Sequence, residues 1–297
     1  MRAFTMIVAY SLFISPAQAD RVSEDDMPGN KMAREIEEVF SFDEKENLGV
    51  NFVVGNDLWL PGERFEDGTD WLALVCNAQG CNFQPAALSV KPDQWQGHYD
   101  DEPTSGQRLT FTTGADHDGE VTGWFQEAPA FRWLEEGVAT TYHSSRHQPG
   151  LLPERSALEV TIHLPNDETA RLVPLLAIST MLNKWQPGRN YSWPRAVLQL
   201  RSQRQRQLLP GDLGTCSGLF HPRNYLLWAG DLDKDDKPDY LISYIDADGP
   251  VHLFLSTAAS ADQLVGLGGI YDSPPHGGEC DGPEGFLYFD EVGPDGS

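Results

Sequence analysis

Hydrophobic and polar residues alternate along much of this chain with the period of two that is typical of half-buried β-strands. The clearest case is Ala157–Leu164, in which every second residue from Leu158 onward is aliphatic. Trp71–Cys76 is an apolar run, and Ala196–Arg201 alternates again. Glycine and proline are spread along the chain, as in proteins with many short strands. The sequence therefore predicts a mostly β protein of antiparallel sheets, either a sandwich or two small β subdomains.

Four further segments refine this prediction. Arg108–Thr113 and Glu120–Phe125 flank an Asp-Gly turn, which indicates a hairpin. Arg171–Trp185 is ambiguous, because Pro174 interrupts an apolar run that fits either a buried strand or a helical turn. Met32–Phe40 places its apolar residues on one helical face, so a short N-terminal helix is expected there.

The chain divides into four predicted regions. Residues 1–19 combine Arg2, an apolar run and small residues before Asp20, which is typical of a secretory signal cleaved after Ala19. Residues 20–45 form a polar leader with the short helix. Residues 46–195 form a β-rich domain, and residues 196–297 form a second one that carries the loop described below. We expect an exported protein, periplasmic or extracellular, with no membrane insertion.

The formal net charge of −24 limits the classes of partner. Such a chain repels nucleic-acid phosphates and anionic lipid headgroups, so neither is an expected partner, whereas cations and basic proteins are better candidates. Acidity also serves solubility alone. One basic cluster could pair with the protein's own acids or contact a phosphate or sulfated glycan; it comprises Arg195, Arg201, Arg204 and Arg206.

Four cysteines in an exported chain indicate two disulfides. Cys76 and Cys81 are separated by four residues that suit a closed turn, and this pairing leaves Cys216 with Cys280. A zinc site is the competing interpretation, but the repeated close spacing of such sites is missing.

The most informative chemistry lies in Gly230–Leu241, where aspartates occupy the first, third, fifth and ninth positions of a loop. Calcium takes six to eight oxygen ligands, and a compact loop supplies them from alternate side chains and a seventh-position carbonyl. The sequence thus predicts a Ca²⁺ site between two strands. A solvated acidic turn is the alternative. The predicted ligands are Asp231, Asp233, Asp235, the Lys237 carbonyl and Asp239.

This loop resembles the calcium loop of FG-GAP and VCBS-type β repeats over about residues 226–255. The family pattern has glycine at the sixth position, where this chain has Asp236, so weaker binding is expected. The resemblance implies calcium binding in an exported protein concerned with adhesion or recognition. An EF-hand is a poorer match, because its twelfth-position acid is replaced by Ile242 and its flanking helices by strands.

No catalytic motif of comparable quality occurs elsewhere in the sequence. The expected function is therefore non-catalytic binding of an unknown protein or glycan. One alternative is an envelope or polysaccharide hydrolase that uses an acid pair such as Glu135–Glu136, or Asp281 with Glu284. Another is an inhibitor or immunity-type protein whose acidic surface neutralises a basic partner.

Overall fold

The computed structural model describes residues 47–62, 64–96, 102–114, 119–144, 159–182, 190–211, 225–244 and 250–272. Within these residues the fold is mostly β and antiparallel, and the only helical elements of three or more residues are short 3₁₀ turns. The predicted signal, the leader and the helix at Met32–Phe40 lie outside the described residues, as do Cys216 and Cys280. The elements are β1 (Phe52–Val53), β2 (Leu58–Pro61), β3 (Gly68–Asn77), β4 (Gly80–Trp95), β5 (Thr104–Thr113), β6 (Glu120–Gln126), β7 (Gly137–Ser144), β8 (Val160–His163), η3 (Pro165–Asp167), β9 (Thr169–Leu182), β10 (Asn190–Arg201), β11 (Arg206–Leu209), β12 (Leu226–Asp231), β13 (Asp239–Ser243), β14 (Val251–Leu255), η4 (Ser256–Ala258) and β15 (Gly266–Tyr271).

Eleven strands form one nearly closed, barrel-like sheet. Its order is β1-β6-β3-β4-β7-β12-β13-β14-β15, with β5 beside β4 and β2 beside β5. The last strand returns to the first: the backbone N–H groups of Leu48 and Val50 donate to the carbonyls of Leu267 and Gly268, at 3.2 and 2.9 Å. The sequence suggested a sandwich or two subdomains, whereas a single sheet joins strands from both halves of the chain.

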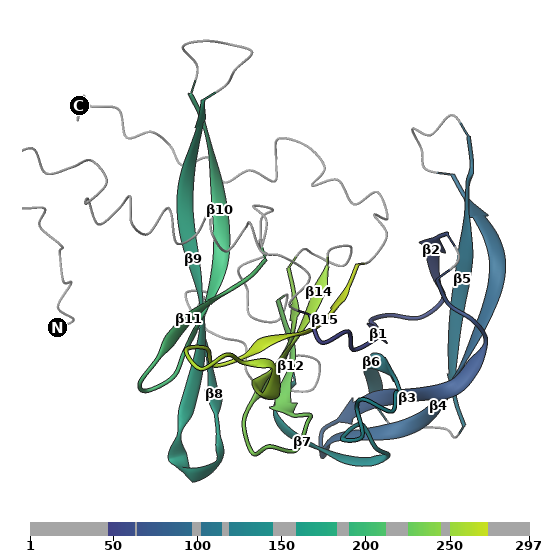
Figure 1. The fold of residues 1–297 in the computed structure, drawn as a ribbon, viewed down its shortest axis with the longest axis horizontal. Coiled ribbons are helices and arrows are strands. Elements are labelled where there is room, and N and C mark those ends of the chain that lie inside the picture. Colours follow the sequence, from purple (N-terminus) through teal and green to yellow (C-terminus); the bar gives the residue numbers. More distant parts are fainter. Residues whose placement is uncertain are drawn as a thin grey trace, which may run out of the picture.

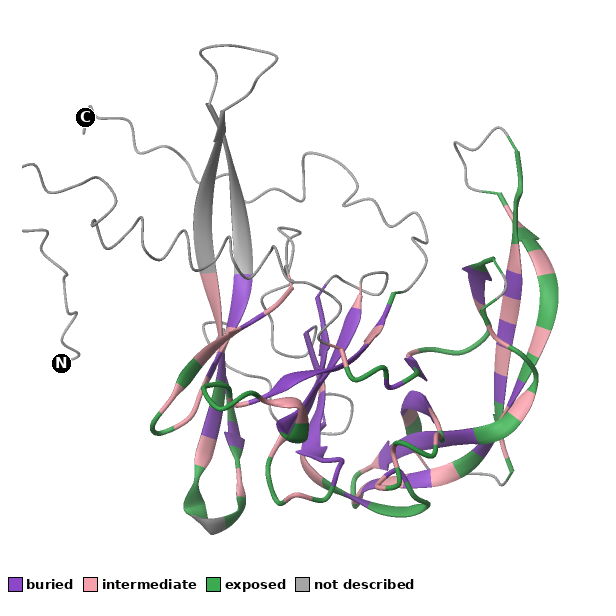
Figure 2. Cartoon of the chain, in the orientation of Figure 1, coloured by how far each residue is buried: buried purple, intermediate pink, exposed green. Residues whose placement is uncertain are grey.

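The second sheet has four strands in the order β11-β10-β9-β8 and covers the outer face of β12–β15. Figure 1 shows this sheet on the left, strands β2–β5 on the right, and β12, β14 and β15 between them. Strands β13 and β14 are buried at every position, because one face packs inside the barrel and the other against the second sheet (Figure 2). This explains their continuous apolar sequences.

A tight hairpin joins β3 to β4. Cys76 pairs with Cys81 across it, and a disulfide bridges them, which confirms the first predicted pairing. The two outer edges of this hairpin are taken by β6, which pairs with β3, and by β5, which pairs with β4. The predicted hairpin between β5 and β6 is therefore wrong, although both segments are strands. The local Asp-Gly signal was overridden by pairing with the β3–β4 hairpin.

The ambiguous segment at 171–185 contributes to β9, a long strand that pairs with β10 from Arg171 to Leu182. Residue 196, the predicted boundary between two β-rich domains, lies inside β10. The division into two domains stays a prediction. Within the described residues, no helix is long and apolar enough to cross a membrane.

The double burial of β13 yields a stability prediction. Leu241 faces the barrel core and its neighbour Ile242 faces the second sheet, and both are fully buried. Leu241→Ala and Ile242→Ala should each lower the free energy of unfolding by about 2–5 kcal/mol. Val138→Ala, at a side chain that is 88% exposed, should change it by less than about 0.5 kcal/mol. Guanidinium unfolding measures all three. An Ile242→Ala cost as small as that of Val138→Ala would contradict the packing of the second sheet on the barrel.

Candidate metal centre

The predicted calcium loop lies between β12 and β13, as the sequence indicates. These strands pair down to Gly230 and Asp239, so the intervening residues form a closed turn. Lys234 and Asp236 have φ angles of 62° and 64°. The sixth position therefore adopts the left-handed conformation for which the family pattern uses glycine, and Asp tolerates it better than most residues.

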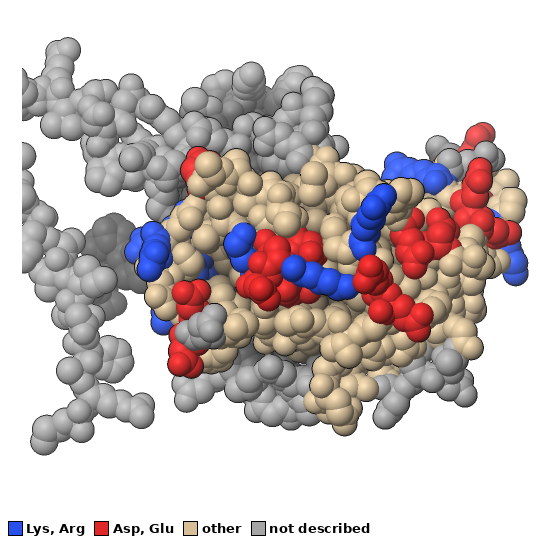
Figure 3. All heavy atoms as spheres, turned by 60° about the horizontal axis from the view of Figure 1, so that its bottom comes forward, with Lys and Arg blue, Asp and Glu red and all other residues tan. Residues whose placement is uncertain are grey.

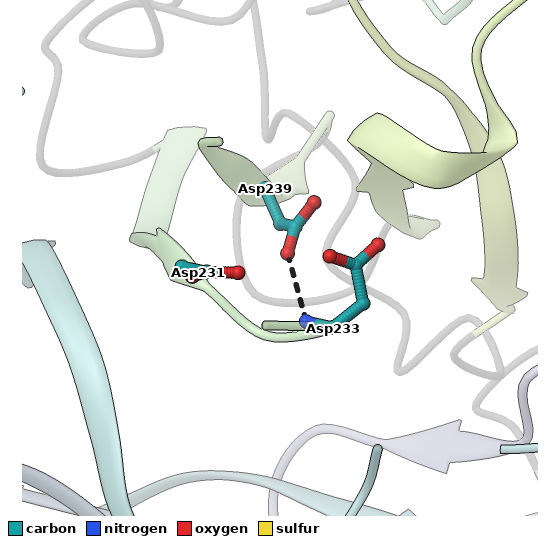
Figure 4. Close-up of side chains that lie close together, drawn as sticks. All are labelled: Asp231, Asp233 and Asp239. Carbon is teal, nitrogen blue, oxygen red and sulfur yellow. Dashed lines mark hydrogen bonds between the residues drawn. The ribbon is translucent and has the colours of Figure 1, made fainter. Parts of the chain in front are cut away.

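Three carboxylates of the loop converge. Each of Asp231, Asp233 and Asp239 offers an oxygen, and these three oxygens lie within 4.8 Å of one another. Figure 4 shows the Asp233 and Asp239 carboxylates side by side, with Asp231 opposite. Asp231 and Asp233 are each 8% exposed and Asp239 is 0% exposed. Carboxylates are almost never buried this deeply unless they are paired.

Backbone hydrogen bonds hold two of these carboxylates in place. Asp231 accepts from the backbone N–H groups of Asp235 and Asp236, both at 3.0 Å. One oxygen of Asp239 accepts from Leu232 N–H at 2.6 Å and Asp233 N–H at 3.3 Å. Its other oxygen accepts from Ser256 N–H at 2.7 Å. The backbone of the loop and of η4 therefore positions these two carboxylates without a bound metal ion.

Asp233 differs because one of its oxygens has no partner. Its Oδ2 accepts from the Thr257 hydroxyl and, at 3.4 Å, from the Thr257 backbone N–H. Its Oδ1 is buried and receives no hydrogen bond. A buried carboxylate oxygen without a donor is costly, and a bound cation is one way to compensate it.

Burial raises the pKa values of two acids of the triad, as expected where buried negative charges lack a compensating positive charge. Burial raises the pKa of Asp239 well above its ordinary value, and the neighbouring Asp233 charge raises it further. Burial, followed by the charges of Asp235 and Asp231, also raises the pKa of Asp233. Among the described residues no basic side chain forms an ion pair with the triad. These acids therefore favour either a proton or a cation.

The two remaining predicted ligands lie at the rim. Asp235 accepts from both the backbone N–H and the Nζ of Lys237, each at 3.0 Å. Burial acts to raise the pKa of Asp235, but the nearby Ser256 side chain and the hydrogen bonds from Lys237 lower it overall. Asp235 is not one of the three converging acids, so its role and that of the Lys237 carbonyl stay predictions.

Ser256 and Thr257 are site residues that the sequence did not indicate. They follow β14 in the short turn η4 and contact Asp239 and Asp233. Only the pairing of β13 with β14 brings this turn beside the loop. Tyr142 on β7 is a further neighbour: burial, and then the nearby charge of Asp231, raise the pKa of its hydroxyl.

The arrangement can hold a metal ion. Its ligand atoms are all hard oxygens from a preformed turn, which suits calcium, magnesium or manganese rather than soft-ligand metals. The fold and the site thus define a β-rich protein with a buried acidic triad that could bind a metal. No protein-family model, curated protein or solved structure matches this chain.

The raised pKa of Asp239 predicts how the metal-free protein responds to pH. A carboxyl with a raised folded-state pKa binds its proton more tightly when folded, so its contribution to stability increases as pH falls toward the ordinary value of 3.8. In EDTA, acidification from pH 7 to pH 5 should therefore stabilise the wild type more than Asp239→Asn. The measurement is the free energy of unfolding of both proteins at both pH values.

Asp236→Asn is the control for this pH prediction, because it removes one charge from an exposed position in the same loop. It should keep the wild-type pH response. An equal response in wild type and Asp239→Asn would show that this carboxyl is not perturbed by burial.

Proposed function

We propose that the chain is an exported β-rich protein that binds Ca²⁺ between β12 and β13 and has a non-catalytic binding role. The observation that carries the proposal is the unpartnered oxygen of Asp233, buried beside two other carboxylates. The calcium ion would compensate the charge of the triad and fix the loop against η4. Neighbouring turns would then present a rigid surface to a protein or glycan.

The loop sequence supports calcium among the hard cations. Calcium takes six to eight oxygen ligands at about 2.3–2.6 Å, and a compact loop supplies them from alternate side chains. Three carboxylate oxygens of the loop lie within 4.8 Å of one another, so all three could contact one ion. The spacing of Asp231, Asp233 and Asp239 and the resemblance to FG-GAP and VCBS-type loops support the same ion.

Export is supported by the signal-like residues 1–19 and by the disulfide between Cys76 and Cys81. Of the acids named for the hydrolase alternative, Asp281 and Glu284 lie outside the described residues. Glu135 pairs with Lys234 of the loop at 2.9 Å, which links the loop to the segment before β7. We prefer the binding role because the acids that converge among the described residues are those of the triad, and they suit a cation.

Thermal unfolding in EDTA and in millimolar calcium tests the cation site. A ligand at 100 times its dissociation constant stabilises the folded state by about 2.7 kcal/mol, which corresponds to a rise of several degrees in Tm. Asp233→Asn should abolish this rise. The same change should not lower the metal-free Tm, because the amide keeps an acceptor for Thr257 and removes a buried charge.

Asp236→Asn is the matched control, since it makes the same chemical change at an exposed side chain that lies outside the triad. It should keep most of the calcium response. If wild type, Asp233→Asn and Asp236→Asn all unfold at the same temperature with and without calcium, the loop is an acidic turn and the proposal fails.

A further inference from the structure

A cavity of about 530 Å³ opens at one end of the barrel-like sheet. It lies where the starts of β1 and β3 meet the ends of β6 and β15, and the connection between β2 and β3 closes one side. Its volume is within the range of small-molecule sites, roughly 300–1,000 Å³. None of its lining residues belongs to the calcium loop.

The wall of this cavity is held in place by hydrogen bonds. The buried side chain of Gln107 accepts from the backbone N–H groups of Arg64 and Phe65 at 2.9 and 3.0 Å, and donates to the Phe65 carbonyl at 2.8 Å. These hydrogen bonds position Arg64 and Phe65 in the cavity lining. In the same lining, Gln126 donates to Asp70 at 2.9 Å and accepts from Asn51 at 3.0 Å. The site is therefore preorganised, which reduces the cost of binding.

The cavity combines aromatic and acidic groups. Phe65 is half-buried and packs against Trp71, with ring centroids 6.0 Å apart, so an aromatic surface borders the opening. Glu66 and Asp272 are exposed in the lining, and among the described residues neither has an ion-pair or hydrogen-bonding partner. The lining includes four carboxylates against one guanidinium: Glu66, Asp67, Asp70 and Asp272, with Arg64.

We propose that this cavity binds an organic cation, an ammonium or guanidinium group on an aliphatic stem. The carboxylates of Glu66 and Asp272 would compensate the positive head of the ligand. The ring of Phe65 would contact this head and the aliphatic stem. A neutral sugar would leave these charges without a partner, and an anion would be repelled. The same chemistry is found in a free diamine and in a lysine or arginine side chain of a basic protein.

Calorimetric titration in millimolar calcium tests the proposal with two probes of matched length, 1,5-diaminopentane and the neutral 1,5-pentanediol, and with a tetralysine peptide. The diamine should bind and the diol should not. The double variant Glu66→Gln/Asp272→Asn should weaken diamine binding at least tenfold. Both side chains lack partners among the described residues, so this variant is expected to fold, which its Tm verifies.

The control is Glu102→Gln/Glu136→Gln, which removes the same charge from two exposed acids outside the cavity and should change the affinity for the diamine less than twofold.

Binding of the diamine identifies a free amine as a sufficient ligand. Binding of the peptide alone, with the same dependence on Glu66 and Asp272, assigns the site to a lysine side chain. The proposal is overturned if neither cation binds, if the diol binds equally well, or if both double variants weaken binding equally.

This inference is independent of the cation site. The two sites share no residue, so a loop that fails to bind calcium leaves the cavity proposal standing, and a cavity that binds no amine leaves the calcium proposal standing.

Discussion

Burial of strands β12–β15 on both faces is the constraint on which the rest of this structure depends. One face fills the barrel-like sheet and the other packs against the four-stranded sheet, so these strands belong to both cores. Loops that connect such strands begin and end in a region that excludes water. The loop between β12 and β13 therefore brings its first and ninth positions, Asp231 and Asp239, into a buried environment.

Burial makes the charges of the loop expensive, and the structure compensates them only in part. Asp239 and Asp231 receive backbone hydrogen bonds that stabilise their ionised forms, while one oxygen of Asp233 receives none. A local turn alone would leave these side chains in solvent, where no cation is needed. The coupling of the turn to a doubly buried sheet is what would give the triad an affinity for positive charge. Acidic side chains gather in several groups on one face of the molecule, beside a few basic ones (Figure 3).

Much of this could be predicted from sequence where the signal is local. Alternation identified the strand at Val160–His163, spacing identified the Cys76–Cys81 disulfide, and the repeated aspartates identified the loop. Pairing across the chain could not be predicted in this way. The β5–β6 hairpin was wrong, because both strands find partners in the β3–β4 hairpin.

The ambiguity at Pro174 and the role of Thr257 have the same cause. Pro174 lies in β9 opposite Leu198 of β10, inside a continuous pairing that runs from Arg171 to Leu182, so its segment is a strand rather than a helical turn. Thr257 reaches Asp233 only through the β13–β14 pairing, 24 residues further along the chain. Neither fact follows from local residue pattern, since each depends on which strand lies alongside.

The most direct test of the cation site is a crystal structure of the protein grown in calcium, with anomalous scattering used to locate the ion. We expect one calcium ion in contact with Asp231, Asp233 and Asp239, at oxygen distances of about 2.3–2.6 Å. A water molecule or a lysine ammonium group at that position, with no anomalous peak, would contradict it.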